Sequence, residues 1–199
     1  MLESTGLINA VGEWVLNSGC EQLRKWHDKG HALRLSINVS ARQFDQGSFG
    51  TVLNDAIKHS NVCPQFLEME ITEGVLISQS EKVADTLREL KKLGVSISLD
   101  DFGTGYSSLS YLKQFPIDIL KIDRSFVMDL NRDKDSLAIV DAIIGLAKSL
   151  HLKVTAEGIE EKNHVQYLRE NNCDEGQGFF YGKPMPNSEF EQLLLDQAV

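Results

Sequence analysis

A chain of 199 residues that is 42% hydrophobic and 25% charged has the length and composition of one globular domain with a sizeable core. Its net charge of −9 argues against nonspecific binding to DNA, RNA or an anionic membrane. No stretch is apolar over the length of a bilayer and no signal peptide is recognisable, so we expect a cytoplasmic protein without a membrane segment.

The first half of the chain alternates amphipathic helices with apolar strands. The apolar spacing of Leu7 to Lys29 predicts a helix that Gly30 ends. The run 33–40 alternates apolar and polar residues, which is typical of a strand with one polar side. Further along, the pattern predicts a helix over 49–59, a strand over 66–73 and a helix over 80–93.

The stretch 96–106 is the most distinctive part of the sequence. An alternating apolar strand ends in Asp100 and Asp101, and a loop with Gly103 and Gly105 follows. Two adjacent carboxylates repel each other unless a cation or a donor lies between them, and Mg²⁺ prefers such oxygen ligands. Taken alone, most pairs of this kind are solvated loop residues, so the pair needs support from the rest of the chain.

The second half repeats the alternation. The pattern predicts helices over 107–115, 136–150, 161–171 and 188–197, and strands over 117–123, 152–158 and 175–181, the last of them aromatic. A helix followed by six strand–helix units implies parallel strands with right-handed crossovers. Both a doubly wound sheet and an eight-stranded barrel satisfy this order.

The polar residues within or at the ends of the strands favour the barrel. A barrel gathers the carboxyl ends of its strands around one mouth, where single polar groups from each strand form a ring. The residues in question are Asn38, Glu70, Asp100, Asp101, Lys121, Glu157 and Gln177. A complete barrel of this type has about 250 residues, so we expect an incomplete (β/α)8 barrel without its first two strands.

Several motifs agree with one known family. They are Asn38-Val39-Ser40, Glu70-Ile71-Thr72-Glu73, the run from Asp100 to Leu109 (DDFGTGYSSL), Leu120-Lys121-Ile122-Asp123, Ala156-Glu157-Gly158-Ile159-Glu160 and Gln177-Gly178. Through them the chain resembles the EAL domain family of cyclic-di-GMP phosphodiesterases over essentially its whole length. The resemblance implies a modified barrel, hydrolysis of cyclic-di-GMP to linear pGpG, and two Mg²⁺ or Mn²⁺ ions.

The resemblance also implies roles for individual residues. Asn38, Glu70 and Asp100 would hold one ion, and Asp101 would join Asp100 on the second. Glu157 would lie near the second ion, and Lys121 would contact the attacking water, as a base or as a group that orients it. Glu73 would hold the loop 102–108, which the family links to dimerisation, and Gln177 would line the pocket. A homodimer and an attached GGDEF or sensor domain are the implied partners besides cyclic-di-GMP.

One departure from the family pattern is plain. No Glu-Ala-Leu tripeptide, the motif after which the family is named, occurs in the chain. We therefore expect residues 1–199 to be a single EAL-type domain that lacks its N-terminal strands, through a fragment or a late start site, with reduced solubility. The alternative function is a noncatalytic module that binds cyclic-di-GMP or a partner protein.

For the remaining cysteine, histidine and tryptophan side chains we expect ordinary structural roles. The odd set Cys20, Cys63 and Cys173 has no ligand-like spacing and is expected as reduced, mostly buried thiols. The five histidines are scattered and expected at the surface. Trp14 and Trp26 are expected to pack rather than to stack on a base.

Overall fold

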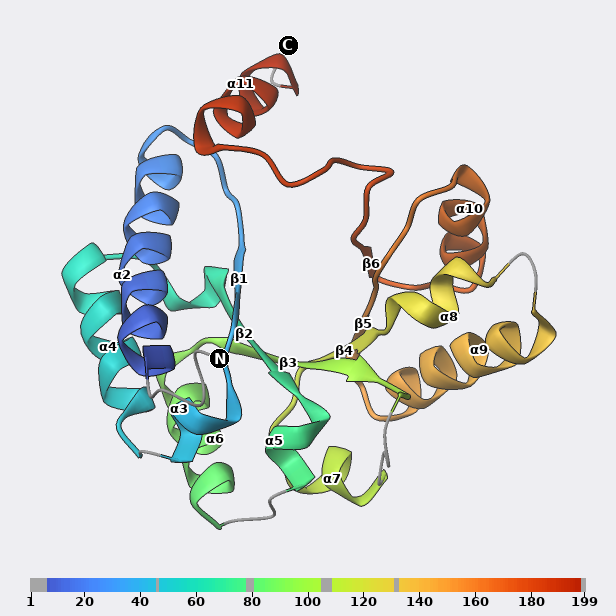
Figure 1. Cartoon of the computed structure of the whole chain (residues 1–199), viewed down its shortest axis with the longest axis horizontal. Coiled ribbons are helices and arrows are strands. Elements are labelled where there is room, and N and C mark those ends of the chain that lie inside the picture. Colours follow the sequence, from blue (N-terminus) through green and yellow to red (C-terminus); the bar gives the residue numbers. More distant parts are fainter. Residues whose placement is uncertain (1–6, 46, 78–80, 105–108, 131–132, 198–199) are drawn as a thin grey trace.

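Six parallel strands form a half-barrel in the computed structural model, which describes residues 7–45, 47–77, 81–104, 109–130 and 133–197 (Figure 1). The strands are β1 (Leu35–Asn38), β2 (Leu67–Thr72), β3 (Ser96–Phe102), β4 (Ile119–Ile122), β5 (Lys153–Ala156) and β6 (Glu175–Gly176). Their order in the sheet is their order in the chain. A doubly wound sheet reverses its strand order, so the unreversed order confirms the barrel-type prediction.

The helices lie on the outer side of this curved sheet (Figure 1). The longer ones are α2 (Leu7–Asp28), α4 (Phe49–Ser60), α6 (Glu81–Leu93), α9 (Lys134–Ser149), α10 (Lys162–Glu170) and α11 (Asn187–Gln197). The short ones are α3 (Ala41–Asp45), the 3-10 turn Pro64–Phe66, α5 (Glu73–Ile77), α7 (Leu109–Gln114) and α8 (Arg124–Met128). Among the helices in the described ranges, none combines the length and apolarity needed to cross a membrane.

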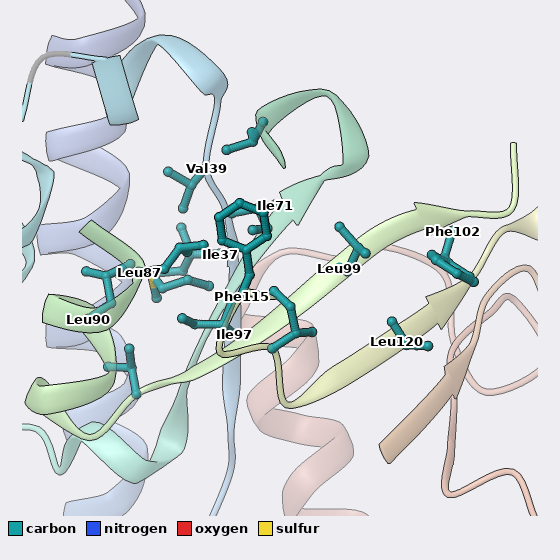
Figure 2. Close-up of a cluster of buried hydrophobic side chains, with 14 of the residues drawn as sticks. Ile37, Val39, Ile71, Leu87, Leu90, Ile97, Leu99, Phe102, Phe115 and Leu120 are labelled. Carbon is teal, nitrogen blue, oxygen red and sulfur yellow. The ribbon is translucent and has the colours of Figure 1, made fainter. Parts of the chain in front are cut away.

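The hydrophobic core lies between the outer face of the sheet and the helices. Figure 2 shows Ile37, Ile71 and Ile97 from three neighbouring strands close to Leu87 and Leu90 of α6. All five side chains are buried. Because side chains alternate along a strand, the residues between these apolar positions face the inside of the half-barrel, where the polar side chains gather.

The C-terminal segment returns from β6 toward the start of the sheet. Figure 1 shows the chain after β6 running back to α11, which lies near the C-terminal end of α2. There the rings of Trp26 and Phe190 are 5.2 Å apart, and Lys29 Nζ lies 2.8 Å from a carboxylate oxygen of Glu191. The last helix therefore packs against the first one that the structure describes.

The structure corrects two element predictions. The sixth strand ends at Gly176 rather than at Tyr181, because the backbone turns where Tyr181 N–H donates to the carbonyl of Gly178 at 3.1 Å. The aromatic run 179–181 is consequently exposed. Three short helices, α3, α5 and α8, follow strands where we predicted none. The predicted starts of the helices at Ser80 and Ser107 lie outside the described residues.

The structure also corrects three side-chain environments. His164 is buried, because it shares the inner face of α10 with Leu168, four residues later. Trp14 is 68% exposed rather than packed, whereas Trp26 packs as predicted. All three cysteines are free, but only Cys20 is fully buried; Cys63 is exposed and Cys173 half-buried.

We expect one fast-reacting thiol in the native protein and three in the denatured protein. The thiolate is the reactive form, and burial raises the pKa of both Cys20 and Cys173 to about 11. Cys63 is exposed. Titration with a chromogenic disulfide at pH 8, with and without urea, measures this. Cys63→Ser should remove the fast phase, and a second fast thiol in the native protein would contradict the prediction.

Candidate metal centre

Five charged side chains reach one rim of the half-barrel from four strands. Glu70 lies near the end of β2, Asp100 and Asp101 near the end of β3, Lys121 in β4, and Glu157 directly after β5. Because the strands are parallel, their carboxyl ends meet at the same rim, as the ring of polar groups predicts. The structure thus brings these five predicted residues together.

Three of the carboxylates form a compact group. Asp100, Asp101 and Glu157 each offer one oxygen atom, and these atoms lie within 4.8 Å of one another. The side chains of Asp100 and Glu157 are only 13% and 17% exposed, whereas Asp101 lies at the surface. Three hard oxygen donors at this spacing match the coordination sphere of a small divalent cation.

Lys121 lies beneath this group and is itself 2% exposed. Its Nζ is 2.7 Å from Glu70 Oε2, 2.7 Å from Glu157 Oε1 and 3.1 Å from Asp100 Oδ1. Burial disfavours the ammonium form, but the hydrogen bonds and charges of Glu157 and Glu70 together outweigh burial and raise the pKa of Lys121. The ammonium of Lys121 therefore partly neutralises the acids.

The neutralisation is incomplete. The carboxylates of Glu70, Asp100, Asp101 and Glu157 outnumber the single ammonium of Lys121 by three formal charges. Burial raises the pKa of Glu157, and Asp100 and Glu70 raise it further against the opposing effect of Lys121. The excess of negative oxygen atoms means that the residues present fit a divalent metal ion.

The backbone at Asp101 is strained in a way that turns its carboxylate toward the group. Asp101 has a φ of 55°, the left-handed region that non-glycine residues rarely adopt. The register between β3 and β4 shifts between Leu99 and Phe102, which marks a bulge. Bulges of this kind re-aim side chains near functional sites, and here two adjacent residues supply carboxylates to one group.

The other predicted site residues surround this group. Asn38 pairs in register with Glu70 on the neighbouring strand and is exposed. Glu73, the first residue of α5, accepts a hydrogen bond from Gly103 N–H at 3.1 Å, and so contacts the loop after β3. The rest of that loop, 105–108, lies outside the described residues. Gln177 lines a cavity of 180 Å³ together with Glu157 and another of 150 Å³ together with Lys121.

Sequence reasoning missed Asp123 as a neighbour of the site. Partial desolvation by neighbouring atoms raises the pKa of Asp101, although the residue lies at the surface, and the charges of Asp100 and Asp123 raise it further. Asp123 also caps α8, since its carboxylate accepts a hydrogen bond from Ser125 N–H at 2.9 Å. Its parity with Lys121 on the predicted strand was the available signal, because residues two apart share a face.

Gly178→Ala is expected to lower the free energy of unfolding by about 2 kcal/mol. A methyl group at this position would lie 2.1 Å from the carbonyl oxygen and 2.3 Å from the nitrogen of Ile159, which are backbone atoms. Gly145→Ala is the matched control, because a methyl group there meets nothing within 4 Å. Urea unfolding compares the two, and equal stability of both variants would contradict the prediction.

Comparison with known proteins shows which family this chain resembles. The family model "EAL domain" matches residues 1–184. The signaling protein YkoW of Bacillus subtilis is 45% identical over 195 residues, which are 98% of this chain and 24% of YkoW. The bifunctional diguanylate cyclase/cyclic di-GMP phosphodiesterase MucR of Pseudomonas aeruginosa is 44% identical over 200 residues, 100% of this chain and 29% of MucR.

Solved structures agree with this relationship. The structure described as PaMucR phosphodiesterase in complex with c-di-GMP has a TM-score of 0.91 and 42% identity, over 95% of this chain and 77% of that one. The EAL domain of Mycobacterium smegmatis DcpA has a TM-score of 0.87 and 38% identity, over 93% and 84% of the two chains. The chain spans about a quarter of the length of the curated relatives named above. Sequence, fold and rim geometry together establish that the chain belongs to the EAL domain family.

Proposed function

We propose that this chain carries the chemistry of a metal-dependent phosphodiesterase that hydrolyses cyclic-di-GMP to linear pGpG. The observation that supports it most is the contact of a buried lysine with three carboxylates at the rim of a half-barrel in an EAL domain. Relatives at 40–41% identity are named cyclic di-GMP phosphodiesterases, NbdA of Pseudomonas aeruginosa and PdeR of Escherichia coli.

In this proposal the rim residues hold two Mg²⁺ or Mn²⁺ ions. Asn38, Glu70 and Asp100 would hold one ion, and Asp101 would join Asp100 on the other with Glu157 nearby. When bound, a pair of divalent ions lowers the pKa of a coordinated water and offsets charge on the attacked phosphate. The carboxylates supply the negative oxygen atoms that such ions need.

The remaining residues orient and enclose the substrate. Lys121 Nζ lies among the carboxylates, 2.7 Å from Glu157 Oε1, where it would orient the attacking water or exchange a proton with it. Glu73 holds the loop after β3 through Gly103 N–H. Gln177 lines the cavity next to Glu157 and contacts the dinucleotide.

A hydrolysis assay tests the proposal directly. The chain is incubated with cyclic-di-GMP in Mg²⁺ or Mn²⁺, and pGpG is quantified by chromatography; a parallel titration in Ca²⁺ measures binding without turnover. Formation of pGpG that depends on the divalent ion and is lost in Asp100→Asn supports the enzyme. Metal-dependent turnover that survives this substitution would contradict the assignment of the site.

One observation favours the alternative, a noncatalytic module that binds cyclic-di-GMP or a partner protein. The sequence contains no Glu-Ala-Leu tripeptide, so one carboxylate of the family motif is not supplied by these 199 residues. Binding in Ca²⁺ with no turnover in Mg²⁺ or Mn²⁺ would support this alternative.

We also propose that the chain works in the cytoplasm next to a GGDEF or sensor domain and pairs as a homodimer. The support for an additional domain is that the matched region is about a quarter of each curated relative, one of which is named as a bifunctional cyclase and phosphodiesterase. Sedimentation velocity of the chain tests the dimer.

A further inference from the structure

Asn38 is the most weakly supported of the proposed metal ligands. It ends a four-residue strand at the edge of the sheet, where it has a hydrogen-bonded neighbour strand on one side among the described residues. Asn38 is exposed, whereas Lys121 and Glu70 are buried. A ligand in such a position needs a second element to fix its orientation, because ligand geometry depends on the groups behind it.

The chain immediately after Asn38 supplies that element. Val39 N–H donates to the carbonyl of Glu70 at 2.8 Å, which continues the ladder for one residue past the strand. Ser40 N–H then donates to Gln43 Oε1 at 3.0 Å, and Gln43 N–H donates to the carbonyl of Ser40 at 3.1 Å. These reciprocal bonds fold the chain into α3, which begins three residues after the ligand.

The side chain of Gln43 is itself held from behind by α2. Gln43 is 8% exposed. A methyl group on Gly12 of α2 would lie 2.1 Å from Gln43 Nε2 and 2.9 Å from its Cδ. The carboxamide therefore rests directly on the helix backbone at a position that only glycine leaves open.

We propose that Gln43 is a positioning residue that orients Asn38 toward the metal centre. Gly12 leaves the space that the carboxamide of Gln43 occupies. This inference rests on the proposed metal role of Asn38. Gln43 contacts no metal or substrate; it acts by fixing the backbone of Ser40, two residues from the ligand. Nothing in the hydrolysis scheme uses either residue otherwise.

The expected effect is on metal affinity rather than on folding. Loss of a group that orients a ligand costs on the order of tenfold in metal affinity. Gly12→Ala displaces only the flexible end of a glutamine side chain, and alanine favours the helix, so the melting temperature should change little. Gln43→Met keeps the length of the side chain and removes the acceptor for Ser40 N–H.

The test measures the affinity of the full chain for Mn²⁺ by titration calorimetry, together with amide hydrogen exchange of residues 38–43. The variants are Gly12→Ala and Gln43→Met, each alone and combined with Asn38→Ala. Gly145→Ala is the matched control, because it is also a glycine within a helix and its added methyl group meets nothing within 4 Å. The control should leave Mn²⁺ affinity unchanged.

Three outcomes decide the inference. If both single variants weaken Mn²⁺ binding about tenfold, speed exchange at Val39 and Ser40, and add nothing once Asn38 is alanine, Gln43 acts through Asn38. If Asn38→Ala weakens binding and neither variant does, the inference is wrong and the proposed function stands. If Asn38→Ala leaves affinity unchanged, Asn38 is not a ligand, and both its metal role and the inference fail.

Discussion

Asp100→Asn is expected to reduce kcat for cyclic-di-GMP hydrolysis at least about a thousandfold, which corresponds to about 4 kcal/mol of transition-state stabilisation. Asp100 belongs both to the carboxylate group with Asp101 and Glu157 and to the ring of acids around Lys121. In the proposed scheme it is the one ligand shared by both ions. An amide keeps its shape and removes the negative charge, so metal binding should weaken with little change in fold.

The measurement combines initial rates with a Mn²⁺ titration of the same preparation. Asp85→Asn is the matched control, because Asp85 lies on α6 with its side chain 68% exposed and pairs with Arg88 at the surface. A rate in Asp100→Asn within tenfold of the original protein, at saturating Mn²⁺, would contradict the proposed role.

Lys121→Ala is expected to lower the free energy of unfolding by about 3 kcal/mol in the absence of divalent ions. Lys121 is the ammonium that balances Glu70, Asp100 and Glu157, and its removal leaves these largely buried carboxylates without the positive charge that they share. Urea unfolding in a chelating buffer measures the loss. Lys91→Ala should cost less, on the order of 1 kcal/mol, because the side chains of Lys91 and Asp118 are each about one-third exposed.

Two conditions should restore part of the stability of Lys121→Ala. Millimolar Mn²⁺ supplies positive charge where the ammonium was lost, by mass action on the folded state. Lower pH acts in the same direction: a carboxyl whose pKa is raised in the folded state binds its proton more tightly there than in the unfolded chain, so folding gains as pH falls from 7 to 5. If Lys121→Ala lowers the free energy of unfolding by the same amount in chelating buffer at pH 7, in Mn²⁺ and at pH 5, lost packing and not lost charge causes the effect.

The polar residues near the carboxyl ends of the strands made most of the site predictable. Period-2 alternation placed Glu70, Asp100 and Lys121 on the inner face of their strands, and the parallel arrangement then required their carboxyl ends to meet. The barrel prediction followed from the same residues and not from helix or strand counts, which also allowed a doubly wound sheet. The burial of Lys121 was not predicted; it results from the acids of β2, β3 and the residue after β5, which surround its ammonium.

Features that depend on contacts between distant segments were not predictable. The sixth strand ends early because the chain turns where Tyr181 N–H donates to the carbonyl of Gly178, and the aromatic residues 179–181 do not indicate that turn. The approach of Asp123 to Asp101 depends on the bulge in β3 and on the left-handed backbone at Asp101. The burial of His164 was different in kind, since its spacing of four from Leu168 was visible in the sequence.

The strand order of the sheet has a consequence for how the molecule forms. Within the described residues, each strand pairs with the strands just before and after it in the chain, so every pairing closes a loop of modest length. During synthesis the sheet can therefore grow by addition at one end as the ribosome releases successive segments. Asn38 and Glu70 leave the ribosome before Glu157, which follows β5, so the acidic donors can come together only after β5 has been made.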